Sequence, residues 1–153
     1  MRYTIHCDRE SRLSETNVRF ETKDNHSTIR FDTPFSGNTS VDVEIEIPEK
    51  ADLDLDLSVG DLKVEGIVGN KFLHVRIGDI HVVDAGHASD YSLVQAKTRI
   101  GDVDWHPRGD GHDQQSNKLD YGKSGWLGGK LNYSGNGKYE LRAEVSVGDI
   151  HIN

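Results

Sequence analysis

One short motif recurs four times and limits the folds open to this chain. It consists of an aliphatic residue, Gly, Asp, a second aliphatic residue, any residue, and a large apolar residue. Repetition of this kind is the signature of stacked, repeating architectures. The motif therefore predicts a fold made of similar units more readily than it predicts a chemical site. Its copies lie in Ser58–Val64, Arg76–Val82, Arg99–Trp105 and Ser146–Ile152.

The spacing of the repeated glycines sets the size of one unit. Gly60 and Gly78 are 18 residues apart, and Gly101 follows Gly78 by 23. A strand advances about 3.3 Å per residue, so a unit of this length suits one circuit of a β-helix. Gly148 follows Gly101 by 47 residues, close to twice 23, which predicts one unmarked coil between them.

Each position of the motif has a physical role at a corner between strands. Glycine adopts positive φ and permits close backbone approach. The short Asp side chain can bond to the backbone of its own turn. The aliphatic residues on either side are expected to point inward with period two. We therefore predict that Gly60, Gly78, Gly101 and Gly148 are structural corner residues.

The rest of the chain alternates between apolar and polar residues in short runs typical of strands. Val41–Ile47 shows the purest alternation, and no segment has the 3.6-residue period of a helix. We predict one all-β domain with essentially no helix. Its parts are N-terminal strands over residues 1–38, regular coils over 39–105, a loop-rich irregular coil over 106–128, and a C-terminal hairpin with the last repeat over 129–153.

The order of these motifs resembles a family of bacterial adhesin-like domains. The similarity covers about residues 39–152 and lies in Ile45–Pro48, Leu53–Leu57, the first repeat through Gly66, and the Gly-rich segment that leads from Gly135 to the last repeat. The resemblance implies a right-handed, single-stranded β-helix or β-solenoid-like stack of unknown molecular function. It also implies a place in the cell envelope or outside the cell, and it supplies no catalytic residues.

Charge and composition exclude some classes of partner and leave the location of the protein open. The formal charge of −8, without a Lys/Arg cluster to offset it, argues against nucleic acid. No apolar run approaches the roughly 20 residues of a membrane helix, so we expect no membrane insertion. Met1–His6 lacks the apolar segment of a signal peptide, which keeps a cytoplasmic location open. The single cysteine, Cys7, cannot form an internal disulfide.

The repeated aspartates suggest a metal hypothesis. In coils stacked in register, Asp61, Asp79 and Asp102 would lie about 4.8 Å apart, in a column that offers carboxylates to Ca²⁺. A calcium site needs more oxygen ligands than one Asp per coil supplies. We therefore expect the aspartates to cap their own corners, and we expect no metal or other cofactor.

A second column contains two histidines. His81 and His151 share one position of the repeat, and Lys63 and Asp104 are its equivalents in the other copies. Alternation directs this column outward. A metal site of His81, Asp104 and His151 is disfavoured, because several coils are expected to separate the two histidines. We expect solvated surface residues here.

Residues 106–118 form a polar, Gly- and Pro-marked segment, which predicts a surface loop. It contains the integrin-type tripeptide Arg-Gly-Asp at 108–110, although tripeptides of this length recur by chance. Trp105 takes the place of inward aliphatic residues and is expected in the core. The candidate partner contacts in and beside the loop are Arg108, Asp110, His112, Tyr121 and Trp126.

These features favour a non-enzymatic interaction module of the cell surface, which presents its faces and loop to an unknown protein or glycan. One alternative is a self-assembling structural solenoid that forms homo-oligomers through the strand edges at its ends. Another is a β-helix that binds or cleaves polysaccharide with paired carboxylates. The acidic outward faces argue against the last reading, because they would repel an anionic chain.

Overall fold

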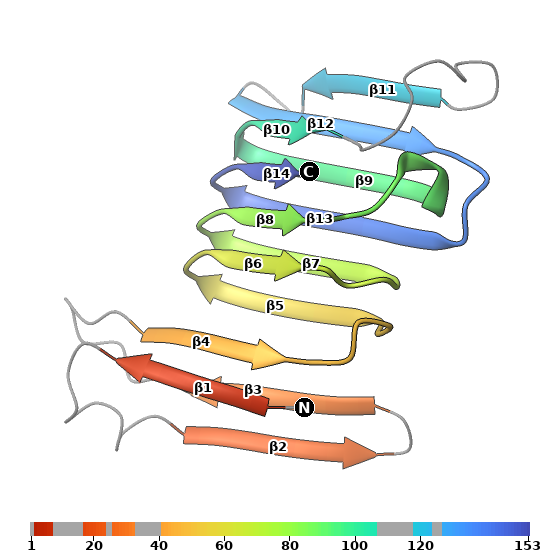
Figure 1. The fold of residues 1–153 in the computed structure, drawn as a ribbon. Coiled ribbons are helices and arrows are strands. Elements are labelled where there is room, and N and C mark those ends of the chain that lie inside the picture. Colours follow the sequence, from red (N-terminus) through yellow and green to blue (C-terminus); the bar gives the residue numbers. More distant parts are fainter. Residues whose placement is uncertain (1, 8–16, 24–25, 33–40, 107–117, 124–126) are drawn as a thin grey trace. The chain divides into compact units, whose positions relative to one another are not determined.

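Strands make up most of the described part of the chain (Figure 1). The computed structural model describes residues 2–7, 17–23, 26–32, 41–106, 118–123 and 127–153. Within these residues the only helical element is η1, a single 3-10 turn at Ala88–Asp90. The prediction of an all-β fold with essentially no helix is confirmed for this part of the chain. Contacts divide the chain into two compact units, Met1–Ile47 and Pro48–Asn153, and each is described by itself.

The first unit contains two antiparallel strand pairs. β1 (Arg2–Cys7) pairs with β4 (Val41–Glu46), and β2 (Asn17–Lys23) pairs with β3 (His26–Asp32). β4 corresponds to the alternating run that the sequence predicts at 41–47. It ends shortly before Pro48, which has no N–H to donate to a neighbouring strand.

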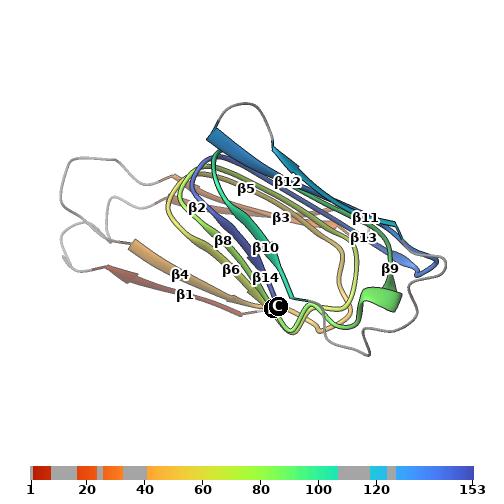
Figure 2. The ribbon, with the colours of Figure 1, turned by 90° about the horizontal axis from the view of Figure 1, so that it is seen from above.

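The second unit contains two sheets. The larger has the order β11-β12-β9-β13-β7-β5, and the smaller has the order β10-β14-β8-β6. Figure 2 shows them as two layers joined at the ends of their strands. Each copy of the motif forms the corner at which the chain passes from a strand of the larger sheet to a strand of the smaller one, and such a pair of consecutive strands is here named a coil. The strands are β5 (Leu53–Val59), β6 (Leu62–Glu65), β7 (Lys71–Ile77), β8 (Ile80–Val83), β9 (Tyr91–Gly101), β10 (Val103–Trp105), β11 (Lys118–Lys123), β12 (Leu127–Ser134), β13 (Tyr139–Val147) and β14 (Ile150–Ile152).

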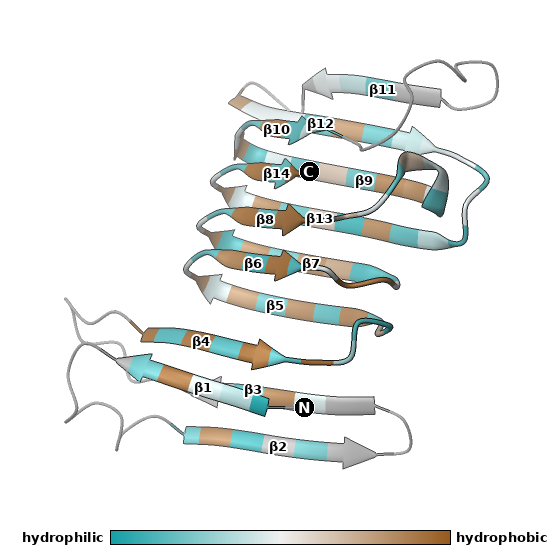
Figure 3. Ribbon diagram, viewed as in Figure 1, coloured by the Kyte–Doolittle hydropathy of each residue, from teal (hydrophilic) through white to brown (hydrophobic). Residues whose placement is uncertain are grey.

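The core lies between these two sheets. Hydrophobic and hydrophilic residues alternate along the strands (Figure 3), and the apolar side chains of Val75, Ile80 and Leu141 are fully buried. Burial of one such side chain stabilises the fold by about 1.5–3 kcal/mol. Trp105 is also in the core, as expected, and its ring meets that of Tyr133 edge-on with centroids 4.9 Å apart.

The coils do not stack in the order of the sequence. β13 lies between β7 and β9, β14 lies between β8 and β10, and all four pairings are parallel. The last coil, residues 139–152, is therefore inserted between the second and the third. The prediction of consecutive coils is wrong, because β12 occupies the other edge of β9 and leaves only the near edge open to the returning chain.

The segment between the third and fourth motifs also departs from the prediction. Its described residues form no unmarked coil: β11 and β12 run antiparallel to each other, and β12 runs antiparallel to β9. The larger sheet is thus mixed, and the unit is not the regular single-stranded solenoid that the sequence suggested.

The expected C-terminal hairpin is wrong as well, because β9 lies between β12 and β13. The connection between these two strands crosses the start of β9, where the Gly137 N–H donates to the Tyr91 carbonyl at 3.1 Å. A Cβ at Gly137 would lie 2.2 Å from the carbonyl carbon of Asp90. The glycines that suggested a hairpin turn therefore permit a close crossing over another strand.

Candidate functional site

The four Gly-Asp corners stack directly on one another. Their glycines follow the spatial order Gly60, Gly78, Gly148, Gly101, with φ between 126° and 136°. A Cβ on Gly148 would lie 2.2 Å from the carbonyl oxygen of Gly78, and a Cβ on Gly101 would lie 2.0 Å from that of Gly148. The backbone conformation favours glycine at all four corners, and the close packing of coils also requires it at Gly78, Gly148 and Gly101.

The aspartates of the motif join each coil to the next. Oδ1 of Asp61 accepts the N–H of Asp79 at 3.0 Å, and Oδ1 of Asp79 accepts the N–H of Asp149 at 2.8 Å. Oδ1 of Asp149 in turn accepts the N–H of Asp102 at 2.7 Å. The expectation that each aspartate caps its own corner is therefore wrong for these three. The column also contains Asp149, which sequence order had separated from Asp79.

This ladder gives the aspartates a structural task. A hydrogen bond to a charged group contributes about 1.5–3 kcal/mol when its partner is otherwise desolvated. Among the described residues, no group of three or more His, Cys, Asp or Glu side chains is placed to hold a metal ion. Calcium binding at Asp61, Asp79 and Asp102 stays the alternative that the sequence disfavours.

A different set of contacts lies at the opposite ends of the same strands, where β5, β7 and β13 of the larger sheet begin. This side of the unit is here named the opposite edge. Oδ1 of Asp52 accepts the N–H of Asn70 at 2.7 Å, and Oδ1 of Asn70 accepts the N–H of Glu140 at 2.9 Å. Here too a side chain of one coil caps the backbone of the next. The residue types differ from coil to coil, however, so no repeated motif marks this edge.

Lys71, at the start of β7, is only 1% exposed. Its Nζ donates to the Gly69 carbonyl and to the Tyr91 hydroxyl, each at 3.2 Å, and the Tyr91 hydroxyl donates to the Ala85 carbonyl. Burial lowers the pKa of Lys71, although the charge of Asp52 acts in the opposite direction. Burial, helped by Asp90, raises the pKa of Tyr91 to about 12.

The sequence reasoning missed this buried lysine. The available signal was parity: alternation along β7 places Lys71 on the same side as Leu73 and Val75, which are both in the core. A lysine in phase with core residues indicates a buried ammonium with its own hydrogen-bond partners, because an ammonium is rarely buried without partners.

The residue before each corner glycine is exposed and apolar. Val59, Ile77, Val147 and Ile100 are 43–49% exposed, and Leu127 is 63% exposed. Successive members are paired in register across β5, β7, β13, β9 and β12. These five residues form a continuous row, here named the apolar stripe. The expectation that the aliphatic residues before the glycines point inward is wrong.

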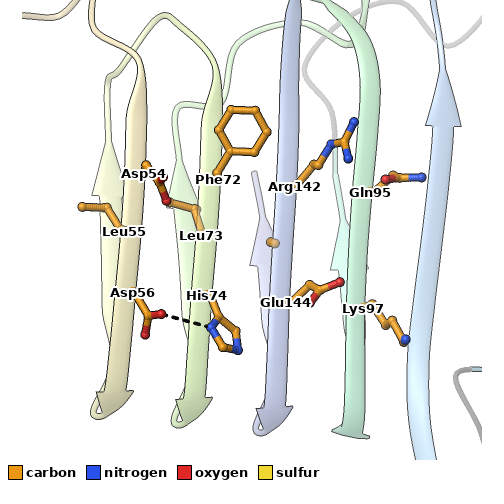
Figure 4. Close-up of a pocket in the computed structure, with 11 residues that line it drawn as sticks. Asp54, Leu55, Asp56, Phe72, Leu73, His74, Gln95, Lys97, Arg142 and Glu144 are labelled. Atoms are coloured by element: carbon orange, nitrogen blue, oxygen red, sulfur yellow. Dashed lines mark hydrogen bonds and ion pairs between the residues drawn. The ribbon is translucent and has the colours of Figure 1, made fainter. Parts of the chain in front are cut away.

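The outward face of the larger sheet carries a shallow groove of about 260 Å³ (Figure 4). Phe72 is 40% exposed, and the guanidinium of Arg142 lies 6.0 Å from the centre of its ring. Nδ1 of His74 lies 3.5 Å from Oδ2 of Asp56. The lining is a mixture of acidic, basic and amide groups on neighbouring strands, which suits polar ligands without selecting one charge. Its other polar members are Asp54, Gln95, Lys97 and Glu144.

The outward face of the smaller sheet brings the two repeat histidines together. His81 and His151 are paired in register, and their rings stack with centroids 5.1 Å apart and an interplanar angle of 18°. Nδ1 of His151 lies 3.5 Å from Oδ2 of Asp104, and Lys63 is the register neighbour of His81 on its other side. The expected separation of the two histidines is wrong, because the last coil lies beside the second.

Of the predicted partner contacts, only Tyr121 lies among the described residues. It is 52% exposed, and its hydroxyl donates to the Trp105 carbonyl at 3.2 Å. Arg108, Asp110, His112 and Trp126 lie outside the described residues. No helix in the described part of the chain is long and apolar enough to span a membrane.

Comparison with known proteins adds no relative: no family model, no curated protein and no solved structure matches the chain. The resemblance to bacterial adhesin-like domains therefore stays a prediction.

Proposed function

We propose that this protein is a non-enzymatic, adhesin-like interaction module of the cell envelope and that it binds a partner through the apolar stripe. The stripe is the observation that carries the proposal. Five large aliphatic side chains lie in one row, each 43–63% exposed. Contiguous exposed apolar surface with a polar rim marks interaction sites in soluble domains. The chain supplies such a rim, since Arg76 and Arg99 precede two members of the stripe.

The corner chemistry supports an interaction module over an enzyme. The carboxylates of Asp61, Asp79 and Asp149, which the repeat offers for acid–base work, accept backbone N–H groups of the next coil. Carboxylates with these hydrogen bonds stabilise the contact between neighbouring coils. The parallel pairing among β5, β7, β13 and β9 also supports the likeness to adhesin-like domains, although the sheet as a whole is mixed and the order of its strands is permuted.

Site-specific photo-crosslinking in the producing cells tests the proposal. A photo-reactive residue at Val147, in the middle of the stripe, is expected to give a discrete adduct, whereas one at Lys63 on the smaller sheet is not. Adding Ile77→Ser and Ile100→Ser beside the Val147 probe should suppress the adduct by removing its apolar neighbours. Lack of an adduct from every stripe position, or an adduct unaffected by the serines, would contradict the proposal.

A second candidate is self-assembly, because β5 ends the larger sheet of the second unit and has a pairing partner on one side only among the described residues of that unit. Within the described residues β5 pairs only with β7, and an open strand edge templates pairing with another chain. Crosslinked adducts of twice the chain mass, together with a mass that rises with concentration in light scattering, would favour this candidate. A heterologous adduct from a strictly monomeric protein would favour the first.

A further inference from the structure

The His81–His151 pair exists because the last coil is inserted between two earlier ones. β14 lies beside β8 in parallel register, which places His151 next to His81 on the outward face. β10 lies on the other side of β14 and places Asp104 next to His151. Three side chains from three different coils are thus adjacent on one solvent-facing row. The parallel ladder fixes their spacing.

Asp104 orients the ring of His151. Its Oδ2 lies 3.5 Å from Nδ1, and a carboxylate in this position favours the tautomer that carries its proton on Nδ1. That tautomer leaves the lone pair of Nε2 free to bind a metal. A histidine that binds a metal commonly donates its other ring N–H to a carboxylate in this way.

The spacing of the rings suits an ion shared between them. Metal–nitrogen bonds are about 2.0–2.1 Å long, so two imidazole nitrogens that bind one ion at neighbouring coordination positions lie about 3–3.4 Å apart. The two rings stack with centroids 5.1 Å apart, so their in-plane lone pairs run side by side, and rotation of the two side chains is needed to turn both Nε2 atoms toward one ion beside the stack. The His151 side chain is 35% exposed, so water can complete the coordination.

We propose that His81 and His151 form a two-histidine site for a late first-row divalent transition metal, with water as the remaining ligands and Asp104 as a positioning residue. Imidazole ligands select ions such as Cu²⁺, Ni²⁺ and Zn²⁺, with Cu²⁺ bound most tightly. The hard cations Ca²⁺ and Mg²⁺ require oxygen ligands and are not bound here. The site ties together β8 and β14, which are distant in the sequence.

Calorimetry with Ni²⁺ on the untagged full chain at neutral pH tests the site. One equivalent is expected to bind, and either His81→Ala or His151→Ala should weaken binding at least tenfold. Asp104→Asn should weaken it about tenfold without changing the stoichiometry, as loss of a partner that orients a ligand does. Ca²⁺ should give no heat.

His74→Ala is the matched control. His74 also lies 3.5 Å from a carboxylate, that of Asp56, but its register neighbours are acidic and no second histidine adjoins it. This variant should bind Ni²⁺ with unchanged affinity. Paramagnetic Ni²⁺ should also broaden the imidazole NMR signals of His81 and His151 before that of His74. Wild-type affinity in either His81→Ala or His151→Ala, or loss of binding in His74→Ala, would overturn the proposal, provided that circular dichroism shows all variants folded.

Discussion

The two edges of the coiled unit are built by different means. Where the strands of the larger sheet end, one Gly-Asp pair recurs in every coil, and each copy contacts the next. Where the strands begin, single contacts do the same work, such as Asp52 with Asn70 and Asn70 with Glu140. At both edges, the hydrogen bonds join neighbouring coils. A substitution at either edge should therefore also destabilise the neighbouring coil.

The largest effect should come from removing a corner glycine inside the stack. Gly148→Ala places a Cβ 2.2 Å from the Gly78 carbonyl oxygen in addition to the strained φ of 136°. We expect a loss of more than about 4 kcal/mol in the free energy of unfolding, or failure to fold. Gly60→Ala is the matched control, because its Cβ would meet only Leu57 Cδ2 at 3.6 Å. Backbone strain alone predicts a loss of about 1–3 kcal/mol there, measured by urea denaturation. Equal losses in the two variants would show that coil contact is not what excludes a side chain.

The next largest effect should follow the loss of a carboxylate from the ladder. Asp79→Ala leaves the Asp149 N–H without its acceptor, and we expect a loss of about 1.5–3 kcal/mol. Asp79→Asn retains an oxygen acceptor and should lose less. Asp102→Ala is the control, since no described residue donates to that carboxylate in the ladder. Chemical denaturation of the three variants should rank them in this order. Hydrogen exchange should show the Asp149 amide deprotected only when Asp79 is changed to alanine.

Lys71 and Tyr91, where strands of the larger sheet begin, should make the free energy of unfolding depend on pH. The pKa of Lys71 is lowered in the folded chain, so as pH rises toward 10.5 the folded state releases this proton before the unfolded state does, and stability rises. Above pH 10.0 the unfolded chain ionises Tyr91 first, since its folded pKa is about 12, and stability falls. The free energy of unfolding should rise by no more than about 1.4 kcal/mol per pH unit. Lys71→Met should abolish the rise and keep the fall, as thermal or urea melts across this range can establish. A rise that survives in the variant would assign it to another group.

The smallest effect on stability is expected in the apolar stripe. Ile77 is 49% exposed, so Ile77→Thr should change the free energy of unfolding by less than about 1 kcal/mol. Val75→Thr, two residues earlier and fully buried, is the comparison and should lose clearly more. Urea denaturation measures both. A large loss at Ile77 would mean that the stripe is covered within the molecule and does not serve a partner.

The sequence predicted the position of the corners and the role of their glycines, because the motif repeats. Each Gly-Asp pair combines a residue that allows positive φ with a short acceptor, and the spacing of Gly60 and Gly78 equals one coil. The order of the coils was not predictable from the motif, because the copies are interchangeable in register. It depends on β12, whose antiparallel pairing closes the far edge of β9.

The candidate sites were harder to predict for the same reason. The proximity of His81 and His151 follows from coil order, so reading the chain consecutively placed them apart. The apolar stripe was missed because period two fails at the corner, where Arg76 and Ile77 are exposed in succession. Lys71 was the one feature that parity alone could have revealed.

Because the last coil in the sequence lies between two earlier coils, the last part of the chain completes the middle of the second unit. Residues 139–152 are synthesised after both coils that they separate, so the seam between β7 and β9 can be filled only by the last segment of the unit. Closing that seam requires contacts between residues far apart in the chain, which slows folding. The seam fits the same segment from a neighbouring chain equally well. Protein concentration during refolding should therefore decide between monomers and segment-swapped dimers.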